Sequence, residues 1–424
     1  MTNIKINRSL RKTHQTKSVG LLWIKQQFDK YTPLKDSKFS FKEKLYGISI
    51  ASLFLAMIFR AYLGGGSIRN YNKTWNKDKN LGRFAGYKEK LSHRLLNRNL
   101  NDLQDKAVRG IVNSTAIRIY KSLNIIPRFV AFDCSNITVS GDNYELSGLV
   151  KKNGKILKGY KLHLAIDLIT KMPIAYILTP INVHDSQRVK ELLRLIKENF
   201  GDYPKEITFD RGYYNHDFFK LIDSLNIFFY TPAKNYKYFK EAINYSYPSD
   251  YTHYKKLKVW AKDITTEISK YGKIRLIIVY NKTIEDWMPA EGKSKDHWGI
   301  LTNNYQKTCE EIIECYKLRW QIEVFFRSCK QKLGLNDLPG RSYNQVSTHV
   351  GIIMLSYLLI TASKLEDDES TTLELIEITE WIKKYIDGVA TITGYGDTIE
   401  IFFDEKSWLY WQLLENSNDR RILI

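Results

Sequence analysis

The stretch YKLRWQIEVFFRSCK, residues 316–330, groups its polar side chains on one side if it forms a helix. An α-helix turns by about 100° per residue, so Tyr316, Arg319, Glu323 and Lys330 would project from one stripe about 60° wide. A carboxylate among two cations and a phenol suits a helix that binds a metal ion beside a polyanion, which suggests a phosphodiester substrate. The alternative is an ordinary amphipathic helix, whose Arg319–Glu323 pair would contribute only a few tenths of a kcal/mol.

Two further carboxylates stand in or beside apolar strands. The segment RFVAFDCSNITV places Asp133 inside a predicted strand, and EITFDRGYYN places Asp210 at a strand end before a turn at Gly212. Aspartate is disfavoured in strands, so each acid needs an explanation, and bonds to nearby backbone would be enough for either one alone. Together with Glu323 they form a set of oxygen ligands suited to two Mg²⁺ (or Mn²⁺) ions.

The spacing in the first stretch also resembles a family signature. Tyrosine, two residues, arginine, three residues, glutamate, six residues and lysine is the pattern of the DDE transposases of insertion-sequence family four. Tyr316, Arg319, Glu323 and Lys330 match it without a gap. The segments KGYKLHLAIDLITKMPIAYILTPINVHDS, DRGYYN and WGILTNN look like the corresponding segments of these transposases, and the resemblance is strongest over residues 129–341.

The order of predicted elements agrees with the fold that this resemblance implies. After the Asp133 strand come two strands, KGYKLHLAIDLIT and MPIAYILTP, and the helix DSQRVKELLRLIKENF, for which Asp185 or Ser186 is the predicted N-cap. The Asp210 strand, the helix NHDFFKLIDSLN and the strand IFFYTPA follow. We predict an α/β fold: a ribonuclease H-like catalytic core with an all-β insertion, flanked by mainly helical N- and C-terminal regions. The resemblance implies that Asp133 and Asp210 lie side by side.

The predicted organisation divides the chain into four regions. The core comprises residues 125–234 and 308–340, and the insertion comprises residues 235–307. Residues 1–124 are predicted to be helical and basic, and in the resembled family this region binds the transposon end. Residues 341–424 contain HVGIIMLSYLLITASK, a predicted buried helix, and TTLELIEITEWIKKYI, a second predicted helix. In relatives this part contributes to the pairing of subunits.

The insertion alternates with period two in KLKVWAKDITTEI and KIRLIIVYN, with a turn at Tyr271 and Gly272. Tyrosines interleave with lysines, among them Lys255 and Lys256, in a mixture that suits phosphate contact and base stacking. Equally, these side chains would pack and protect edge strands from association. The sequence leaves both interpretations open.

Composition favours a nucleic-acid partner. Lysine and arginine number 65 against 46 aspartates and glutamates, which gives a net charge of +19. The apolar run from Gly47 to Phe59 is shorter than the roughly 20 residues of a membrane span and is followed by Arg60, so we expect a buried helix and no membrane partner. Four cysteines without paired CxxC spacing argue against a zinc site and fit a reducing cytosol. We therefore expect a cytoplasmic, nucleoid-associated protein.

The resemblance implies a cut-and-paste DNA transposase, which cleaves at element ends and joins the 3′-hydroxyl to target DNA. Asp133, Asp210 and Glu323 would be the catalytic metal ligands. The expected DNA-binding residues are Tyr316, Arg319, Lys330, Arg211, Lys255 and Lys256. Its partners would be inverted-repeat ends and a target duplex, bound by a homodimer.

The cleavage route and the function each keep alternatives. Some relatives carry a tryptophan that stacks on a flipped base, where this chain has Tyr213 and Tyr214, so the route of second-strand cleavage is not predicted. A metal-dependent nuclease of the same fold and a domesticated, non-catalytic DNA-binding protein are the alternative functions. The complete acid triad disfavours the latter, because binding alone would not need it.

Overall fold

The structure is a computed structural model that describes residues 3–7, 15–16, 20–36, 47–87, 89–281, 296–366, 390–395 and 398–403. The chain divides into two units. The first, here called the helical unit, comprises Met1–Ile125, Ile137–Tyr160 and Phe325–Ile424. The second, here called the sheet unit, comprises Ile126–Asn136 and Lys161–Val324.

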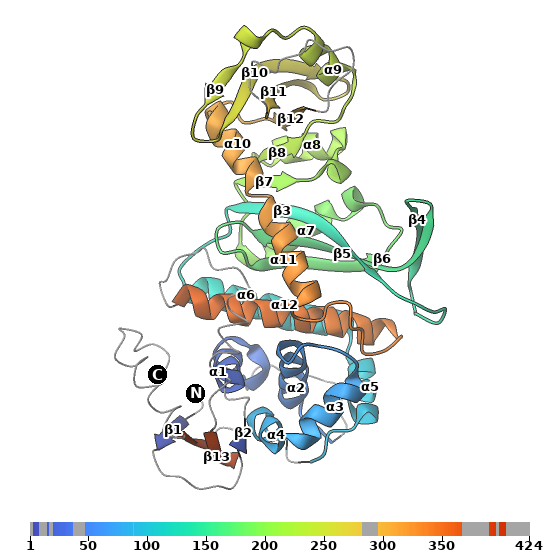
Figure 1. The fold of residues 1–424 in the computed structure, drawn as a ribbon, viewed down its shortest axis with the longest axis vertical. Coiled ribbons are helices and arrows are strands. Elements are labelled where there is room, and N and C mark those ends of the chain that lie inside the picture. Colours follow the sequence, from blue (N-terminus) through green and yellow to red (C-terminus); the bar gives the residue numbers. More distant parts are fainter. Residues whose placement is uncertain are drawn as a thin grey trace. The chain divides into compact units, whose positions relative to one another are not determined.

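The sheet unit is built on a large mixed sheet. Its strands follow the order β5-β3-β7-β8-β12-β11-β10-β9, and β6 pairs with β5 (Figure 1). The strands are β3 (Phe129–Thr138), β5 (Lys155–Asp167), β6 (Pro173–Pro180), β7 (Glu206–Phe209), β8 (Phe228–Pro232), β9 (Thr252–Tyr254), β10 (Val259–Ile268), β11 (Gly272–Tyr280) and β12 (His297–Thr302). The fold is therefore mixed α/β.

Pairing divides this sheet into a parallel and an antiparallel part. β3 pairs with β7, and β7 with β8, in parallel. β8, β12, β11, β10 and β9 pair in succession as antiparallel neighbours. In the parallel part, Ile207, Thr208 and Phe209 of β7 are all buried, as expected of a central strand covered on both faces.

Two helices of the sheet unit each bury one apolar face. In α7 (Val189–Phe200) the buried residues are Val189, Leu192, Leu193 and Ile196, and in α8 (His216–Ser224) they are Phe218, Phe219 and Ile222. α7 ends at Gly201, whose φ of +86° is a left-handed conformation that glycine adopts without strain. The predicted order of strands and helices from the Asp133 strand to β8 agrees with the structure, which adds β4 (Gly148–Lys152).

The β4 strand belongs to a hairpin that we did not predict. β4 pairs antiparallel with the first residues of β5, from Gly148 opposite Gly159 to Lys152 opposite Lys155. Asn153 and Gly154 form the turn, with φ values of 51° and 75°. Asn-Gly is the strongest short-range signal for such a two-residue turn, so the sequence did contain the information.

Residues 235–307 are not entirely β. They contain the helix α9 (Lys237–Asn244) and the 3-10 turn Pro248–Asp250 besides strands β9 to β12. The period-two pattern covered only the strands. The short helix has one buried residue, Phe239, which leaves little apolar periodicity to detect.

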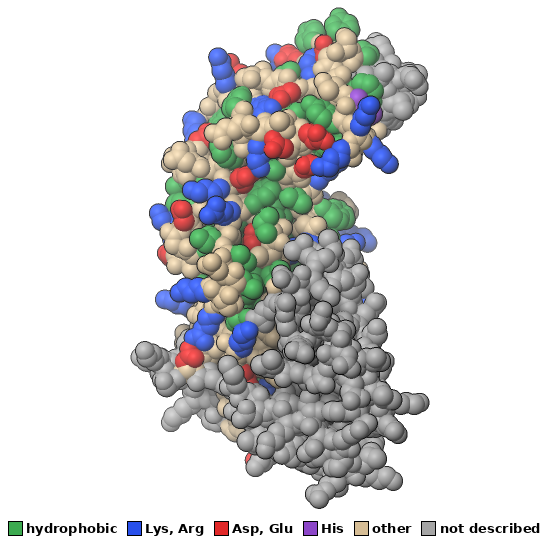
Figure 2. Space-filling model, turned by 90° about the vertical axis from the view of Figure 1, so that its left-hand side faces the viewer, with side chains coloured by type: hydrophobic (Ala, Val, Ile, Leu, Met, Phe, Trp, Pro, Cys, Tyr) green, Lys and Arg blue, Asp and Glu red, His purple; other side chains and the backbone are tan. Residues whose placement is uncertain are grey.

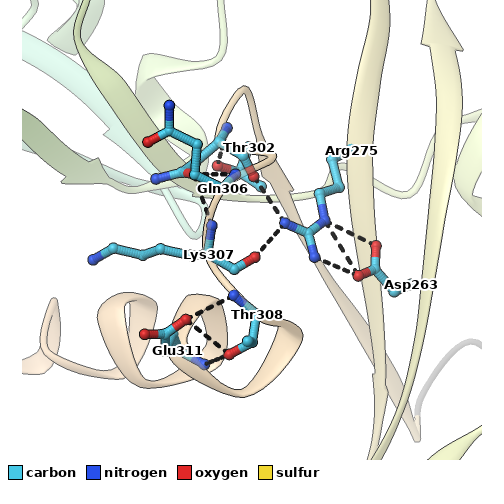
Figure 3. A network of polar contacts seen from close by, with 8 residues as sticks. Asp263, Arg275, Thr302, Gln306, Lys307, Thr308 and Glu311 are labelled. Atoms are coloured by element: carbon cyan, nitrogen blue, oxygen red, sulfur yellow. Dashed lines mark hydrogen bonds and ion pairs between the residues drawn. The ribbon is translucent and has the colours of Figure 1, made fainter.

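An arginine fixes the end of this strand region to the segment that leads into α10 (Cys309–Lys317). Arg275 of β11 pairs with Asp263 of β10 at 2.5 Å, and its Nη1 donates to the carbonyls of Asn304 and Lys307 at 3.0 and 2.6 Å (Figure 3). One guanidinium therefore holds both the strand pair and the approach to the helix.

The next residues start α10 with a capping box. The Thr308 Oγ1 accepts the N–H of Glu311 at 3.3 Å, and the Glu311 carboxylate accepts the N–H of Thr308 at 2.7 Å (Figure 3). Such reciprocal bonds satisfy two donors that would otherwise be unpaired at a helix start.

Residues 316–330 do not form one helix, so the prediction of a single helix there was wrong. α10 ends at Lys317, and α11 (Trp320–Gln331) starts three residues later. Between them the N–H groups of Arg319 and Ile322 bond to carbonyls three residues back, those of Tyr316 and Arg319. Bonds of this tighter type interrupt the helix between Tyr316 and the other three signature residues.

The helical unit contains α1 (Gly20–Tyr31), α2 (Ile50–Tyr62), α3 (Ile68–Lys77), α4 (Lys79–Ala85), α5 (His93–Asp102), α6 (Asp105–Ser122) and α12 (Tyr343–Glu366). α2 is the predicted buried helix, with its N-cap at Ser49. Arg60, which follows the apolar run, is 1% exposed and donates to the carbonyls of Asp337, at 2.6 Å, and Gly66. Its charge is thus compatible with burial.

α12 is the other predicted buried helix. Among the described residues it alone is long and apolar enough to cross a membrane by length and composition, and its apolar window is fully buried within the structure. A buried core helix has the same composition.

The C-terminal prediction was incomplete. β13 (Ala390–Tyr395) and β14 (Thr398–Phe403) join β1 (Asn3–Asn7) and β2 (Gln15–Thr16) in a small sheet, where we predicted mainly helix. The alternation in TIEIFF is typical of a strand. The predicted helix TTLELIEITEWIKKYI lies outside the described residues.

Candidate active site

The first two acids lie at equivalent positions on neighbouring parallel strands. In the register of β3 and β7, Phe132 pairs with Phe209. Asp133 directly follows Phe132, Asp210 directly follows Phe209, and the two strands run in the same direction. They are therefore neighbours across the sheet, 77 residues apart in sequence (210 minus 133).

Asp133 lies in an environment that disfavours its charge. Its side chain is 19% exposed, and its Oδ1 accepts the N–H of Cys134 at 2.7 Å. The pKa of Asp133 is raised to about 7, mainly by burial and also by the charges of Asp210 and Glu323. Asp210 and Glu323 are therefore close enough for their charges to act on Asp133.

Arg319 links the sheet acid to the helix acid. Its Nη2 donates to Glu323 at 2.5 Å, and its Nη1 lies 3.5 Å from Asp133. The guanidinium also lies over the ring of Tyr316, at 5.8 Å from the centroid. One cation thus partly neutralises two carboxylates, and it lowers the pKa of Asp133 against the effect of burial.

The remaining predicted DNA contacts lie at different places. Arg211 is exposed and directly follows Asp210. Lys330 lies on α11, and burial together with the charge of Lys152 lowers its pKa. Lys255 and Lys256 are exposed between β9 and β10, where Lys256 pairs with Glu314 of α10 at 2.6 Å.

The three acids fit a divalent cation by chemistry, although not in the present side-chain arrangement. Carboxylates are the ligands that Mg²⁺ and Mn²⁺ prefer, and a cation would relieve the repulsion from Asp210 and Glu323 that adds to burial in raising the pKa of Asp133. Within the described residues, no group of three or more His, Cys, Asp and Glu side chains could hold a metal ion as it stands. Arg319 provides the positive charge between Asp133 and Glu323 instead.

Comparison with known families shows the family to which this chain belongs. The family model described as "Transposase DDE domain" matches residues 106–359, more than half of the chain. The chain belongs to the DDE transposase domain family. Membership of insertion-sequence family four stays a prediction.

Two similar proteins are also named as transposases. "Putative transposase y4zB" of Sinorhizobium fredii is 27% identical over 220 residues, which are 51% of this chain and 56% of that protein. "Probable transposase for insertion sequence element IS5377" of Geobacillus stearothermophilus is 28% identical over 89 residues, 21% of this chain and 23% of that protein. The chain thus spans about half the length of the first relative and less of the second.

Comparison with solved structures gives a match at low sequence identity. It is the cryo-EM structure of the piggyBac transposase synaptic complex with hairpin DNA, with a TM-score of 0.48 and 12% identity. The match covers 87% of this chain and 80% of that one.

In this DDE transposase domain, Asp185 does not have the role that we predicted. α7 has Arg188 as its N-cap, without a side-chain bond, so neither Asp185 nor Ser186 caps it. The turn Asp185–Gln187 intervenes and is capped by His184, whose Nδ1 accepts the N–H of Ser186 at 3.3 Å. Because this turn delays the helix start, Asp185 is free to pair with Lys161 of β5 at 2.7 Å.

The two tyrosines after Asp210 differ in accessibility. Tyr213 is 0% exposed, and its hydroxyl lies 2.9 Å from the Cys134 Sγ, so it cannot stack on a base in this conformation. Tyr214 is partly exposed, and its ring contacts that of Tyr236, at 5.6 Å between centroids, with the Lys234 ammonium 4.8 Å from the Tyr214 centroid. The sequence alone did not distinguish them.

Proposed function

We propose that this chain is a cut-and-paste DNA transposase of insertion-sequence family four, with a ribonuclease H-like core. The observation that carries the proposal is electrostatic. Asp210 and Glu323, both distant in sequence from Asp133, act on its charge in a chain that belongs to the DDE transposase domain family. A structural ion pair would need one carboxylate, whereas a cluster of three suits a metal-dependent reaction.

In this proposal the three acids are the metal ligands. Two Mg²⁺ or Mn²⁺ ions, when bound, would activate the nucleophile and stabilise the leaving oxygen. The chain's own residues hold the scissile phosphate in line with the attacking hydroxyl. Asp133 must lose its proton to serve as a ligand, and its raised pKa means that this happens near neutral pH.

Arg319 has two roles in the proposal. Without DNA it neutralises Asp133 and Glu323, as the contacts of 3.5 and 2.5 Å indicate. With DNA, its planar fork would turn to a phosphate and release both carboxylates for metal binding. The Tyr316 ring beneath the guanidinium would support both positions.

The remaining proposed contacts are Lys330, Arg211, Lys255 and Lys256, and the partners are inverted-repeat ends and a target duplex, bound by a homodimer. The net charge of +19 supports an anionic partner. Lysine and arginine side chains are spread over the face drawn in Figure 2, with acidic ones among them. We assign end binding to residues 1–124, and we expect the protein in the cytoplasm, at the nucleoid.

A strand-transfer assay with a pre-cut end separates this function from its alternatives. A transposase joins the end to target DNA in Mg²⁺, a nuclease only cleaves, and a domesticated binding protein does neither. Asp210→Asn should abolish joining, whereas Asp217→Asn, which alters an exposed acid on α8, should not. Joining that persists at the wild-type rate in Asp210→Asn would refute the proposed site.

A further inference from the structure

A polar network lies beside the two acids of the sheet. Cys134 follows Asp133 on β3, and its Sγ lies 3.1 Å from Nδ1 of His163 on β5 and 2.9 Å from the hydroxyl of Tyr213. Tyr213 is the third residue after Asp210. The network thus connects the strand of one acid with the turn that follows the other.

The direction of each hydrogen bond follows from the partners. The Thr179 hydroxyl donates to the Pro180 carbonyl at 3.1 Å, so its oxygen is left to accept from the His163 Nε2, 2.8 Å away. A neutral imidazole has one N–H, and His163 is neutral because burial lowers its pKa to about 4. Its Nδ1 is therefore an acceptor for the Cys134 S–H.

The remaining hydrogen bond is then fixed as well. With its proton committed to His163, the Cys134 sulfur can only accept, so the Tyr213 O–H donates to it. Burial raises the pKa values of both Cys134 and Tyr213, so each keeps its proton. Every donor in the network has a partner, and satisfied networks of this kind hold one geometry.

The turn after Asp210 is also held from a second side. A Cβ at Gly212 would lie 2.7 Å from Oδ2 of Asp185, so the glycine backbone is in close contact with that carboxylate. Asp185 is in turn fixed by Lys161. Backbone next to Asp210 therefore has little freedom to move relative to β5 and β3.

We infer that Cys134, His163 and Tyr213 are positioning residues that set the separation of Asp133 and Asp210. The inference rests on the proposed function, in which both acids are metal ligands. Metal ions tolerate only small errors in ligand position, so loss of a bond in the network would weaken metal binding without removing a ligand. Supporting contacts of this kind typically change metal affinity by about 10–100-fold.

The test uses the DNA-free, full-length protein and Mn²⁺, followed by the electron paramagnetic resonance signal of unbound Mn²⁺. Tyr213→Phe and Cys134→Ala each remove hydrogen bonds of the network, and each should raise the Mn²⁺ dissociation constant about 10-fold. Cys134→Ser keeps a donor and an acceptor at this position and should recover most of the affinity. A structural role alone would not give this order of affinities.

The matched control is Tyr230→Phe. Tyr230 is also 0% exposed in the sheet unit, and its hydroxyl bonds to Glu206 at 2.5 Å and Asn304 at 3.1 Å. Calorimetry should show melting temperatures lowered by similar amounts in Tyr213→Phe and Tyr230→Phe, with Mn²⁺ affinity lowered only in the former.

The inference is overturned if Tyr213→Phe and Cys134→Ala bind Mn²⁺ like the wild type, if Tyr230→Phe weakens binding equally, or if the wild type binds no Mn²⁺. End cleavage by the same preparations tests the proposed function separately. A wild type that does not cleave DNA, together with weaker Mn²⁺ binding in Tyr213→Phe, refutes the transposase but supports the positioning role. A wild type that cleaves DNA, together with unchanged Mn²⁺ affinity in Tyr213→Phe and Cys134→Ala, supports the transposase but refutes the positioning role.

Discussion

The acids of the sheet and the acid of the helix are held in different ways. Asp133 and Asp210 directly follow the paired residues Phe132 and Phe209 of two parallel strands and are flanked by the Cys134–Tyr213 contact. Glu323 lies in the first turn of α11, its side chain is 36% exposed, and it pairs with the side chain of Arg319 at 2.5 Å. In the proposed metal centre, the sheet would therefore supply a fixed pair of ligands and the helix an adjustable one.

The largest expected effect comes from removing any of the three charges. Asp133→Asn, Asp210→Asn and Glu323→Gln should each lower DNA cleavage by on the order of 10⁴-fold, the scale of losing a catalytic group in other enzymes. DNA affinity, measured by gel shift, should change little, because each substitution keeps the side-chain volume. Near-normal cleavage in one of them would remove that residue from the site.

Gly212→Ala tests whether the turn after Asp210 must stay close to Asp185. The added Cβ would meet the carboxylate at 2.7 Å, so cleavage should fall about 10-fold and the free energy of unfolding by about 1–3 kcal/mol. The control is Gly110→Ala in α6, where a Cβ meets nothing within 4 Å. That substitution should stabilise the protein by up to about 1 kcal/mol. Equal cleavage by both variants would show that the turn is tolerant.

Substitutions of Arg319 test the part of the site in which it pairs with Glu323 and Asp133. Arg319→Ala should lower end cleavage, and Arg319→Lys should restore it only in part, because an ammonium cannot reproduce a bidentate fork. The same loss of charge should raise the pKa of Asp133 further, so the pH at which cleavage reaches half its maximum should move upward. A pH profile identical to that of the wild type would contradict the link between Arg319 and Asp133.

The pKa of Asp133 also predicts how metal-free stability depends on pH. Its folded-state pKa of about 7 lies above the ordinary value of 3.8, so the folded protein binds more protons and becomes less stable as the pH rises between these values. Asp133→Asn removes this cost. It should therefore stabilise the metal-free protein relative to the wild type by roughly 1–4 kcal/mol at pH 8 and by much less at pH 4, measured by urea unfolding. A difference that does not grow with pH would mean that the pKa is not raised.

The smallest effect is expected at the strand region of residues 235–307. If Lys255 and Lys256 contact phosphates, replacing both by alanine should flatten the slope of log affinity against log salt by up to about 0.9 per contact. Lys190→Ala with Lys220→Ala, on the exposed sides of α7 and α8, removes equal charge and should leave the slope unchanged. Equal slopes for the two double variants would favour edge protection, or the Lys256–Glu314 pair alone, as the role of these lysines.

The sequence predicted the sheet part of the site better than the helix part. Asp133 and Asp210 could be found because a charge in a short apolar, β-branched run is unusual. Their pairing could not be derived from periodicity and came from the family resemblance. The break at Leu318 and Arg319 had no local signal, since KLRW contains neither glycine nor proline, the usual causes of an interruption.

The network beside the acids could not be predicted either. Cys134, His163 and Tyr213 come from three separate elements, and no spacing in the sequence relates them. Asp185 was misassigned because an acid just before a helix is usually a cap, and no pattern in the sequence indicates its ion pair with Lys161 or its closeness to Gly212. The β4–β5 hairpin, in contrast, was predictable from Asn153 and Gly154.

Fe²⁺-dependent cleavage of the protein backbone tests directly whether Asp133, Asp210 and Glu323 hold one metal centre. Fe²⁺ bound in place of Mg²⁺ generates hydroxyl radicals with ascorbate and peroxide, and these cut the chain near the ion. We expect cuts near all three acids in the wild type and at none of them in Asp210→Asn. Cuts that persist in Asp210→Asn, or that never occur near Glu323, would contradict it.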